Sequence, residues 1–558
     1  MPHVVTQSCC SDASCVYACP VNCIHPTPDE PDFLTAEMLH IDPDTCVDCG
    51  ACVTACPVEA IVPHGKLEER QLTYLSINAD FYKKPRKHPL LAPMVESTAA
   101  RTDSGPLRVA VVGSGPAAMY AADEVLKQPR AQVNVFERLP VPYGLVRSGV
   151  APDHQKTKQV TKLYDMITHE SGFEFFLNVE VGKDVSLDEL LAHHHAVVYA
   201  VGAASDRRLN IPGADLPGVA SATDFVGWYN GHPDHAHRKF DLSHKRVVIV
   251  GNGNVALDVA RILVSDPERL AGTDISDEAL AVLRASKVEE VVIVGRRGSA
   301  QSAFTVPELS GLVANDDFDV LVDRSEEILD PRTAASSERG HAVSQKLAIL
   351  DELDDAAAAK PGRRRIVFRY LRSPLAIHGD ERVESIEFAR GSFASEGSVE
   401  YGTDTDNIEA GLVLTSIGYH GVPVLDLPFD EASGTVPNDG GRVAQRPGVY
   451  VAGWIKRGPT GFIGTNKSCA HETIEHLIAD FNSGELEAPA KAQSDLKKLV
   501  QRRQPEVIDR AGWLAIDAEE LRRGVERQRV RDKIVDRPVA VDVARRSRRK
   551  VGIPFLRG

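Results

Sequence analysis

The sequence predicts an α/β protein, and the prediction rests on two glycine-rich turns and one cluster of cysteines. Each turn follows a short apolar segment, beginning at residues 107 and 245, and precedes a segment compatible with a helix. This strand–turn–helix pattern is typical of doubly wound, Rossmann-like nucleotide-binding domains. Nine of the ten cysteines lie within the first 56 residues. They predict a separate small domain before the two nucleotide-binding domains.

The composition indicates a soluble globular protein of three or four domains, because 43% of the 558 residues are hydrophobic and 26% are charged. No apolar run approaches the roughly 20 residues of a membrane span, and the N-terminus lacks the basic and apolar parts of a signal peptide. We therefore expect a cytoplasmic protein whose clustered cysteines serve metal or redox chemistry. The acidic pI of about 5.7 and the absence of aromatic residues from the basic C-terminal tail argue against nucleic-acid binding.

The segment CVDCGACVTACP, residues 46–57, spaces four cysteines by two, two and three residues, with a proline directly after the last. The earlier segment CCSDASCVYACPVNC, residues 9–23, also contains a Cys-Pro pair but departs from this spacing. In such loops three thiolates surround one iron–sulfur cluster, and the cysteine before proline ligates the other cluster. Each segment is thus expected to contribute ligands to both clusters. Zinc is the alternative, but it prefers two separated pairs of ligands.

The first glycine-rich turn, Gly113-x-Gly115-x-x-Ala118, predicts a dinucleotide site. The glycines permit a tight turn and a close approach of the backbone to a pyrophosphate, which then lies at the helix N-terminus. The next predicted strand ends at Glu137, where a carboxylate can bind the adenosine ribose.

The second turn contains Gly251 and Gly253, and its next predicted strand ends in Arg296 and Arg297 instead of an acid. Arginines at this position attract the 2′-phosphate of NADP(H), which a carboxylate would repel. The alternative is that both are exposed loop residues. NADPH gives up two electrons as a hydride and an iron–sulfur cluster accepts one at a time. Because a flavin can do both, the first site is expected to hold FAD.

Four segments carry a resemblance to a known family: PYGLVRSGVAPDHQ (142–155), VVYAVGA (197–203), GNGNVALDVARIL (251–263) and GWIKRGPTGFIGTNKS (453–468). From residue 107 to about 540 the chain resembles the adrenodoxin reductase family of NADP-dependent flavoproteins. Its first 65 or so residues resemble bacterial seven- or eight-iron ferredoxins. The whole chain is similar to bacterial fusions of a ferredoxin with a ferredoxin–NADP reductase.

The resemblance implies an architecture in which a small α+β two-cluster ferredoxin domain (1–80) and a linker (81–106) precede two Rossmann-like domains. An NADPH-binding domain (204–417) would be inserted in an FAD-binding domain (107–203 and 418–558). The linker is rich in proline and without periodicity, which is typical of a linker or a strap on the surface. Residues 1–80 contain twelve acidic and two basic residues, so we expect them to dock on a basic face near the flavin.

The resemblance also implies residues for each nucleotide. Those expected at FAD are Gly113, Gly115, Ala118, Glu137, Leu145, Val181, Trp454, Gly461, Phe462 and Ile463, the last four lining the isoalloxazine ring. Those expected at NADP(H) are Asn252, Gly253, Asn254, Val255, Arg296, Arg297, Glu308 and Gly461.

For the clusters, the resemblance implies a [4Fe–4S] cluster on Cys19, Cys46, Cys49 and Cys52. A second cluster, [3Fe–4S] or [4Fe–4S], is implied on Cys9, Cys15 and Cys56. Cys10 is either its fourth ligand or a bystander, and Cys23 matches a position that is usually not a ligand.

His154 matches a family histidine near the flavin, where it would take part in catalysis by handling a proton. Its usual partner is an acid three residues after Glu308, but this position is Gly311 here. A purely structural histidine is the alternative.

The expected function is transfer of electrons from NADPH through FAD to the iron–sulfur clusters, to an external ferredoxin or to another redox protein. One alternative is an NADPH-oxidising subunit that feeds a partner enzyme, as the small subunit of glutamate synthase does. Another is a non-catalytic electron carrier. NADPH-dependent bleaching of the flavin would separate the carrier from both enzymes.

Overall fold

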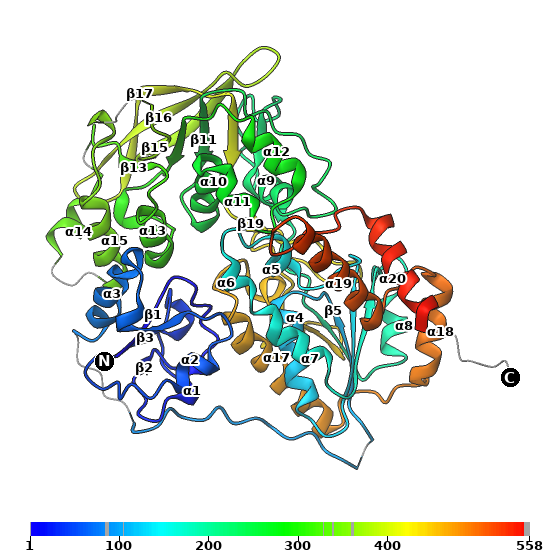
Figure 1. Cartoon of the computed structure of the whole chain (residues 1–558). Coiled ribbons are helices and arrows are strands. Elements are labelled where there is room, and N and C mark those ends of the chain that lie inside the picture. The colour runs from blue at the N-terminus through cyan, green and yellow to red at the C-terminus, as the bar shows by residue number, and fades with distance from the viewer. Residues whose placement is uncertain are drawn as a thin grey trace.

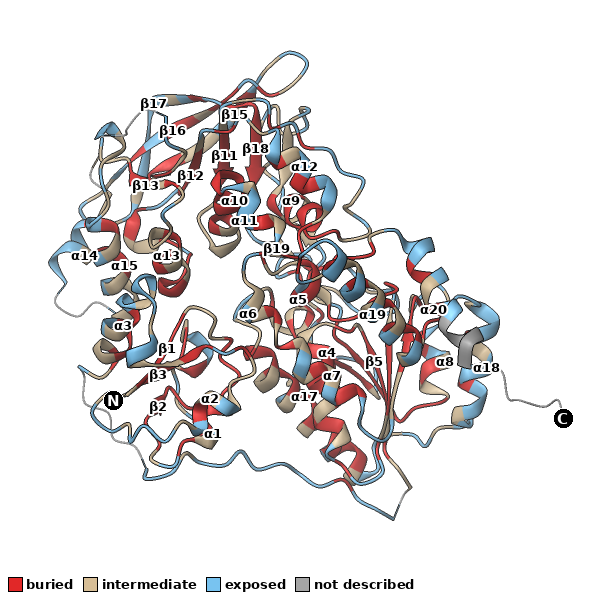
Figure 2. Cartoon of the chain, in the orientation of Figure 1, coloured by how far each residue is buried: buried red, intermediate tan, exposed pale blue. Residues whose placement is uncertain are grey.

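Two parallel sheets and a small N-terminal unit make up the computed structural model of the chain (Figure 1). The structure describes residues 2–83, 89–103, 105–326, 328–336, 340–358 and 362–551, and the side chains of 547–551 are not described. In Figure 2 the strands at the centre of both sheets are buried, whereas exposed residues gather on the outer helices and loops. No helix of the described residues is long and apolar enough to cross a membrane.

The first α/β unit is built on a seven-stranded sheet in the order β20-β21-β22-β8-β5-β6-β7. Its parallel centre consists of β22 (Val449–Val451), β8 (Ala196–Tyr199), β5 (Arg108–Val112), β6 (Gln132–Glu137) and β7 (Phe173–Leu177). These are short apolar runs because helices cover both faces of a parallel sheet. Helix α4 (Pro116–Leu126) follows β5 directly, and its small alanines pack closely against the long helix α17 (Thr465–Ser483).

The second α/β unit has six parallel strands in the order β10-β18-β11-β12-β14-β13. The strands are β10 (Val219–Ser221), β18 (Leu412–Thr415), β11 (Arg246–Val250), β12 (Glu290–Val294), β14 (Arg365–Arg369) and β13 (Asp319–Val322). Helix α10 (Asn254–Val264) follows β11. A three-stranded antiparallel sheet, β15 (Arg372–His378), β16 (Ser385–Phe393) and β17 (Val399–Glu409), is an addition that the sequence analysis does not foresee.

The two connections between the α/β units run side by side. Strand β9 (Ser205–Asp206) leaves the first unit and pairs antiparallel with β19 (Tyr419–His420), which returns to it. The chain therefore enters and leaves the second unit through two paired strands. The mixed α/β fold with its inserted unit is as the sequence predicts. The domain limits at 203/204 and 417/418 stay predictions, although both lie within two residues of the paired crossings.

The N-terminal unit, residues 2–83, has two antiparallel strand pairs and three α-helices among its described residues. Strand β1 (His3–Val5) pairs with β4 (Ile61–Pro63), and β2 (Ile24–His25) pairs with β3 (His40–Ile41). Helices α1 (Ser14–Ala18) and α2 (Ala51–Ala55) carry the cysteine segments, and α3 (Thr73–Phe81) closes the unit. In Figure 1 this unit lies against both α/β units.

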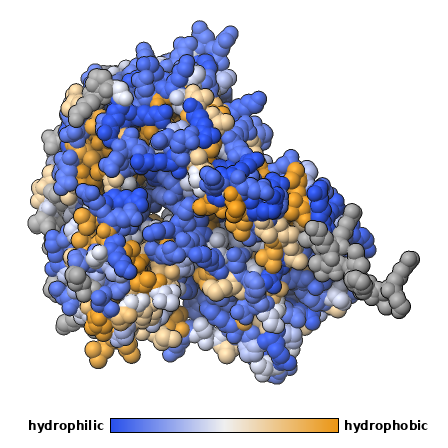
Figure 3. All heavy atoms as spheres, viewed as in Figure 1, coloured by the Kyte–Doolittle hydropathy of each residue, from blue (hydrophilic) through white to orange (hydrophobic). Residues whose placement is uncertain are grey.

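The junction after α3 behaves as a strap on the first α/β unit. The Thr98 backbone N–H donates to Glu475 at 3.0 Å, and Asn482 Nδ2 donates to the Ala99 carbonyl at 2.9 Å. Large apolar side chains of the strap remain exposed at Leu90, Leu91, Met94 and Val95, and the space-filling view shows hydrophobic side chains at the lower left edge of a mostly hydrophilic face (Figure 3). Residues 84–88 and 104 of the predicted linker lie outside the described residues.

Candidate functional site

The first glycine-rich turn has the geometry of a pyrophosphate cradle. Gly113 has a φ of 103°, and a Cβ atom there would lie 2.5 Å from the carbonyl oxygen of Ala200, so only glycine fits. Gly115 begins α4 with no side-chain cap, and no other atom lies within 4 Å of the place where its Cβ would be. The N–H groups of this helix terminus thus face open space that an anion can fill.

Glu137 ends β6 beside this cradle. Its carboxylate accepts hydrogen bonds from Ser114 Oγ at 2.7 Å and from the Leu139 N–H at 2.9 Å. Burial raises the pKa of Glu137, although these hydrogen bonds oppose the shift. The carboxylate is therefore held in one orientation at the strand end, as a group that binds a ribose requires.

The other residues expected at FAD come from three further places in the first unit. Leu145 lies in α5 (Gly144–Ser148), whose first residue Gly144 packs against the backbone of Gly115. Val181 follows β7 and packs with the apolar cluster of the sheet face that includes Val112. Trp454 begins α16 (Trp454–Arg457), donates to the Thr460 carbonyl at 3.1 Å and contacts the ring of Tyr419. The run 461–463 leads from there into α17, with Gly461 at a φ of 79°.

The second glycine-rich turn repeats the first cradle. A Cβ atom on Gly251, whose φ is 113°, would lie 2.1 Å from the Ser416 carbonyl oxygen, and Gly253 begins α10 without a side-chain cap. The Asn252 carbonyl accepts from the Phe304 N–H, and Asn254 Oδ1 accepts from the Thr305 N–H at 2.8 Å. Val255 packs on the apolar core of this unit. These bonds fix the turn against the segment that leads into α13 (Val306–Val313), which carries Glu308.

Arg296 and Arg297 follow β12 and are both exposed. Neither guanidinium forms an ion pair with a carboxylate of the described residues, although the Tyr401 hydroxyl holds the Arg296 carbonyl at 2.5 Å. Two exposed cations beside a dinucleotide cradle, neither of them paired with a carboxylate of the described residues, suit a phosphate group.

His154 lies between two carboxylates at distances too long for hydrogen bonds. Its Nε2 is 3.8 Å from Glu308 Oε2, and its Nδ1 is 3.9 Å from Asp258 Oδ1. Burial raises the pKa of Glu308, while the charge of His154 opposes the shift. Asp258 is also paired with Arg261 at 2.7 Å. A proton can be exchanged within this group only after a small movement of the histidine ring.

Gln7 of the N-terminal unit completes this group, and the sequence analysis misses it. Its Nε2 donates to Glu308 Oε2 at 2.9 Å. No local pattern marks this glutamine as functional, because the two residues are 301 positions apart.

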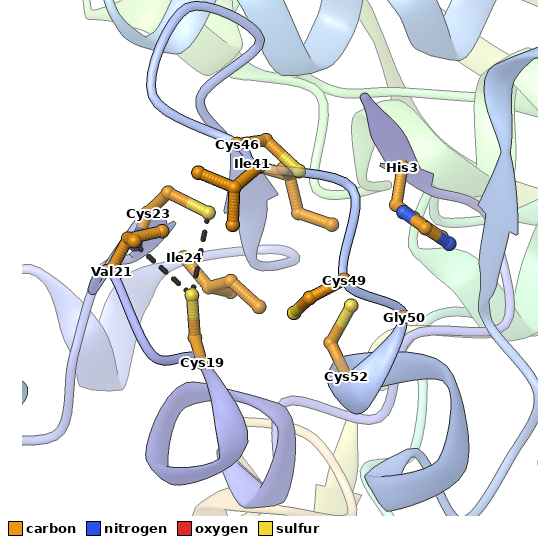
Figure 4. A pocket seen from close by; sticks show the side chains of 11 residues that line it. His3, Cys19, Val21, Cys23, Ile24, Ile41, Cys46, Cys49, Gly50 and Cys52 are labelled. Carbon is orange, nitrogen blue, oxygen red and sulfur yellow. Dashed lines mark hydrogen bonds between the residues drawn. The ribbon is translucent and has the colours of Figure 1, made fainter. Parts of the chain in front are cut away.

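Four of the predicted cluster ligands line one pocket in the N-terminal unit: Cys19, Cys46, Cys49 and Cys52 (Figure 4). Cys23 also lines it, with its sulfur 3.4 Å from Cys19 Sγ, while its backbone N–H donates to the same sulfur at 3.4 Å. The converging thiols and the N–H···S bond fit an iron–sulfur cluster, whose potential such bonds influence.

Of the remaining predicted ligands, Cys9 and Cys56 pack against the core of the first α/β unit, whereas Cys15 lies in the core of the N-terminal unit. Burial raises the pKa of the Cys9 thiol to about 11 and that of Cys15 well above its usual value, and the charge of Asp12 adds to both shifts. The charge of Asp12 also contributes to the raised pKa of Cys56, so this carboxylate acts on all three thiols. A backbone N–H also bonds to Cys56 Sγ, donated by Ala60 at 3.3 Å.

The comparisons with known proteins agree with these sites. Residues 107–310 match the family described as pyridine nucleotide-disulphide oxidoreductases, and residues 39–62 match the 4Fe-4S binding domain. A protein of Mycobacterium tuberculosis named probable ferredoxin/ferredoxin–NADP reductase is 56% identical over 96% of this chain and 94% of its own length. This chain belongs to the ferredoxin/ferredoxin–NADP reductase family.

Solved structures resemble the reductase part of this family member. FprA of Mycobacterium tuberculosis in complex with NADPH covers 79% of this chain with 100% of its own, at 44% identity and a TM-score of 0.74. A mitochondrial NADPH:adrenodoxin oxidoreductase of Arabidopsis thaliana is 39% identical over 79% of this chain and 96% of its own length. The resemblance inferred from the motifs is thereby confirmed, as are the α/β fold class and the presence of an iron–sulfur domain.

Proposed function

We propose that this chain oxidises NADPH and passes the electrons, through FAD, to the iron–sulfur clusters of its own N-terminal unit. The observation that carries the proposal is the contact between the cysteine-bearing loop and the expected flavin segment. The Gly464 N–H donates to the Cys10 carbonyl at 2.7 Å. Gly464 follows the run 461–463, and Cys10 lies beside the expected cluster ligand Cys9. One hydrogen bond thus joins the two redox sites.

In this proposal the nucleotides occupy the two cradles. Gly113, Gly115, Ala118 and Glu137 hold the FAD pyrophosphate and ribose. Leu145 and Val181 also contact the flavin nucleotide, and Trp454 and the run 461–463 line the flavin ring. The turn 252–255, Arg296, Arg297, Glu308 and Gly461 bind NADP(H). FAD, when bound, supplies a group that accepts a hydride and releases electrons singly. His154, which lies between Glu308 and Asp258, would take part in handling a proton near that group.

The N-terminal unit is proposed to carry two clusters. A [4Fe–4S] cluster is bound by Cys19, Cys46, Cys49 and Cys52, and a second cluster is bound by Cys9, Cys15 and Cys56. The second cluster site lies next to Gly464, so its cluster is the first to accept electrons from the flavin. Electrons leave the protein from the other cluster. A cytoplasmic location remains the prediction from the sequence.

Contacts on both α/β units support a fixed docking of the N-terminal unit. Lys346 forms an ion pair with Glu37 at 2.8 Å, and the Tyr74 hydroxyl donates to the Pro307 carbonyl at 2.9 Å. On the first unit, Lys467 Nζ donates to the Asp12 carbonyl at 3.2 Å. The acidic N-terminal unit thus contacts one lysine on each α/β unit.

Anaerobic stopped-flow reduction by NADPH, with flavin and iron–sulfur absorbance followed separately, tests this function. We expect the flavin to bleach first and the clusters to follow at a rate independent of protein concentration, because the transfer is intramolecular. Flavin bleaching without cluster reduction would leave only an external acceptor. No bleaching at all would favour a non-catalytic carrier.

A further inference from the structure

The two cysteine segments are an internal repeat in which cysteines, helices and backbone conformations recur 37 residues later. Cys9, Cys15 and the Cys19-Pro20 pair correspond to Cys46, Cys52 and the Cys56-Pro57 pair. Helix α1 (Ser14–Ala18) corresponds residue for residue to α2 (Ala51–Ala55). The two helices also pack against each other.

The backbone of the repeat confirms this register. Three residues of the first segment adopt positive φ, namely Ser11 at 56°, Ala13 at 60° and Asn22 at 47°. Their counterparts do the same, namely Asp48 at 57°, Gly50 at 75° and Glu59 at 52°. A left-handed conformation is uncommon outside glycine, so three matched pairs indicate the same loop wrapped around the same kind of site.

In this register Asp12 takes the place of Cys49. The first segment therefore does have the two-two-three spacing, as Cys9, Asp12, Cys15 and Cys19, with an aspartate as its second member. When cysteines alone are compared, the first segment departs from the spacing, because an aspartate stands where the second segment has a cysteine.

Cys10 is not in the position of a ligand. Its counterpart in the second segment is Val47, which is 59% exposed. The Cys10 side chain is only 4% exposed and belongs to the apolar cluster that includes Ala117, Tyr120 and Tyr164 of the first α/β unit. It is a packing residue of the contact between units.

The surroundings of Asp12 favour a bound cation. The residue is 6% exposed. Its carboxylate accepts hydrogen bonds from the N–H and the hydroxyl of Ser14, but it forms no ion pair with a basic side chain of the described residues. Lys467 binds the Asp12 carbonyl instead. A buried carboxylate without a counter-charge is costly, and a metal at the neighbouring thiols would supply that charge.

We propose that the Asp12 carboxylate is the fourth protein ligand of the second cluster and holds one iron of a [4Fe–4S] centre with Cys9, Cys15 and Cys56. The inference rests on the proposed two-cluster function. Thiolates are the soft ligands that iron–sulfur clusters prefer, whereas a carboxylate oxygen is hard. The iron on Asp12 is therefore the exchangeable one. A reduced [3Fe–4S]⁰ centre on the three cysteines takes up Fe²⁺ to give [4Fe–4S]²⁺, with no further electron exchanged.

The test uses the full-length protein, reconstituted anaerobically, with EPR spectra and iron and sulfide analysis as readouts. Oxidation with ferricyanide removes one electron and one Fe²⁺ and yields the EPR-active [3Fe–4S]⁺ centre. Dithionite reduction followed by titration with Fe²⁺ then measures how the iron returns. In the wild type we expect about one iron per chain to bind and the [3Fe–4S]⁺ signal to stay absent on gentle reoxidation.

Three variants separate the ligand from its neighbours. Asp12→Asn keeps an acceptor for Ser14 but loses the charge, and we expect it to bind the returning iron at least about tenfold more weakly. Asp12→Cys restores the second spacing in full, and we expect it to resist loss of iron to ferricyanide. Cys10→Ser should behave as the wild type.

Two results would overturn the inference: iron uptake by Asp12→Asn equal to that of the wild type, or loss of the fourth iron in Cys10→Ser. The signal of the reduced cluster on Cys19, Cys46, Cys49 and Cys52 serves as an internal standard in every sample. If the wild type contains only that cluster, the two-cluster function itself fails and the Asp12 assignment falls with it. If both clusters are present, the result concerns Asp12 alone.

Discussion

The carboxamide of Gln7 fills the space in front of Gly311, where a Cβ atom would lie 2.4 Å from three of its atoms. Gln7 belongs to the N-terminal unit and Gly311 to α13 of the second α/β unit. The resemblance implies that relatives carry an acid at position 311. Here the missing side chain admits Gln7, which then bonds to Glu308 beside His154. The glycine therefore serves the docking of the N-terminal unit, and that unit completes the group proposed to handle a proton.

Gly311→Glu is expected to weaken this docking. The new side chain would displace Gln7, and overpacking of this kind costs about 1–3 kcal/mol. Stopped-flow traces should show slower cluster reduction after normal flavin bleaching. The double variant with Gln7→Ala should recover part of the lost rate, because it clears the space. Gly272→Glu is the control, since no atom lies within 4 Å of the place of its Cβ; an equal effect of both substitutions would contradict the docking role.

Gly464→Ala tests the contact with the first unit. A Cβ on Gly464 would lie 2.2 Å from the backbone carbon and oxygen of Ser11, which cannot rotate aside. We expect the cysteine loop to move away from the flavin segment, so that electron transfer to the clusters slows while hydride transfer from NADPH is unchanged.

The direction in which Gly464→Ala changes the stability of the protein shows whether the cysteine loop is docked. Gly464 has a φ of −69°, which alanine adopts easily. Without the docked loop, alanine should be neutral or stabilising by up to about 1 kcal/mol. With the loop in place it should lower the melting temperature. Gly272→Ala, at a φ of −77°, supplies the comparison, and a raised melting temperature in Gly464→Ala would show that the loop is not seated there.

The sequence predicts the two cradles well, because the turns at Gly113 and Gly251 are local: the glycines, the strand before and the helix after are all adjacent in the chain. It cannot predict that Gln7 meets Glu308, because that contact depends on how separately folded units dock. Asp12 is a different case. Its signal is present in the spacing, but it becomes visible only when residues other than cysteine are compared across the repeat. The positive φ angles of Ser11 and Asp48 then fix the register.

The exposed arginine pair should determine the choice of coenzyme. Replacing Arg296 and Arg297 with alanine removes both cations expected at the 2′-phosphate. The loss should amount to about 2–4 kcal/mol in transition-state binding, or roughly 30- to 900-fold in kcat/KM for NADPH, mostly through KM. The rate with NADH should change little. Arg502→Ala with Arg503→Ala, an exposed pair on α18 (Gln493–Arg503), is the matched control. A variant that keeps its preference for NADPH would place the phosphate elsewhere.

A buried charge cluster ties the two α/β units and the C-terminal segment together. Asp274 of the second unit accepts from Lys158 of the first unit at 2.7 Å, and Lys533 lies 2.7 Å from the same carboxylate. All three side chains are at least nine-tenths buried. Although burial opposes ionisation, the two ammonium groups lower the pKa of Asp274 below its usual range. Burial and the neighbouring cations lower the pKa of Lys533 well below its usual value, and the Asp274 carboxylate opposes this shift. The carboxylate is thus the counter-charge that both buried lysines share.

Asp274→Asn should therefore destabilise the protein strongly, by about 3–5 kcal/mol, because it removes the counter-charge that the buried Lys158 and Lys533 share. The midpoint of urea denaturation, followed by release of the bound flavin, measures the effect as a comparison between variants. Asp495→Asn, which breaks an exposed pair with Lys498, should cost less than about 1 kcal/mol. Equal midpoints for the wild type and Asp274→Asn would show that the lysines are not held by this carboxylate.

The pH dependence of that difference gives a second check. The folded-state pKa of Asp274 lies below its unfolded value of about 3.9, so its contribution is fully present above that pH and is lost as the pH falls toward the folded-state value. The gap in midpoint between the wild type and Asp274→Asn should narrow as the pH falls below about 4. A gap that widens on acidification would mean that the carboxyl is protonated more easily in the folded protein than in the unfolded chain. The assigned charge state of the cluster would then be wrong.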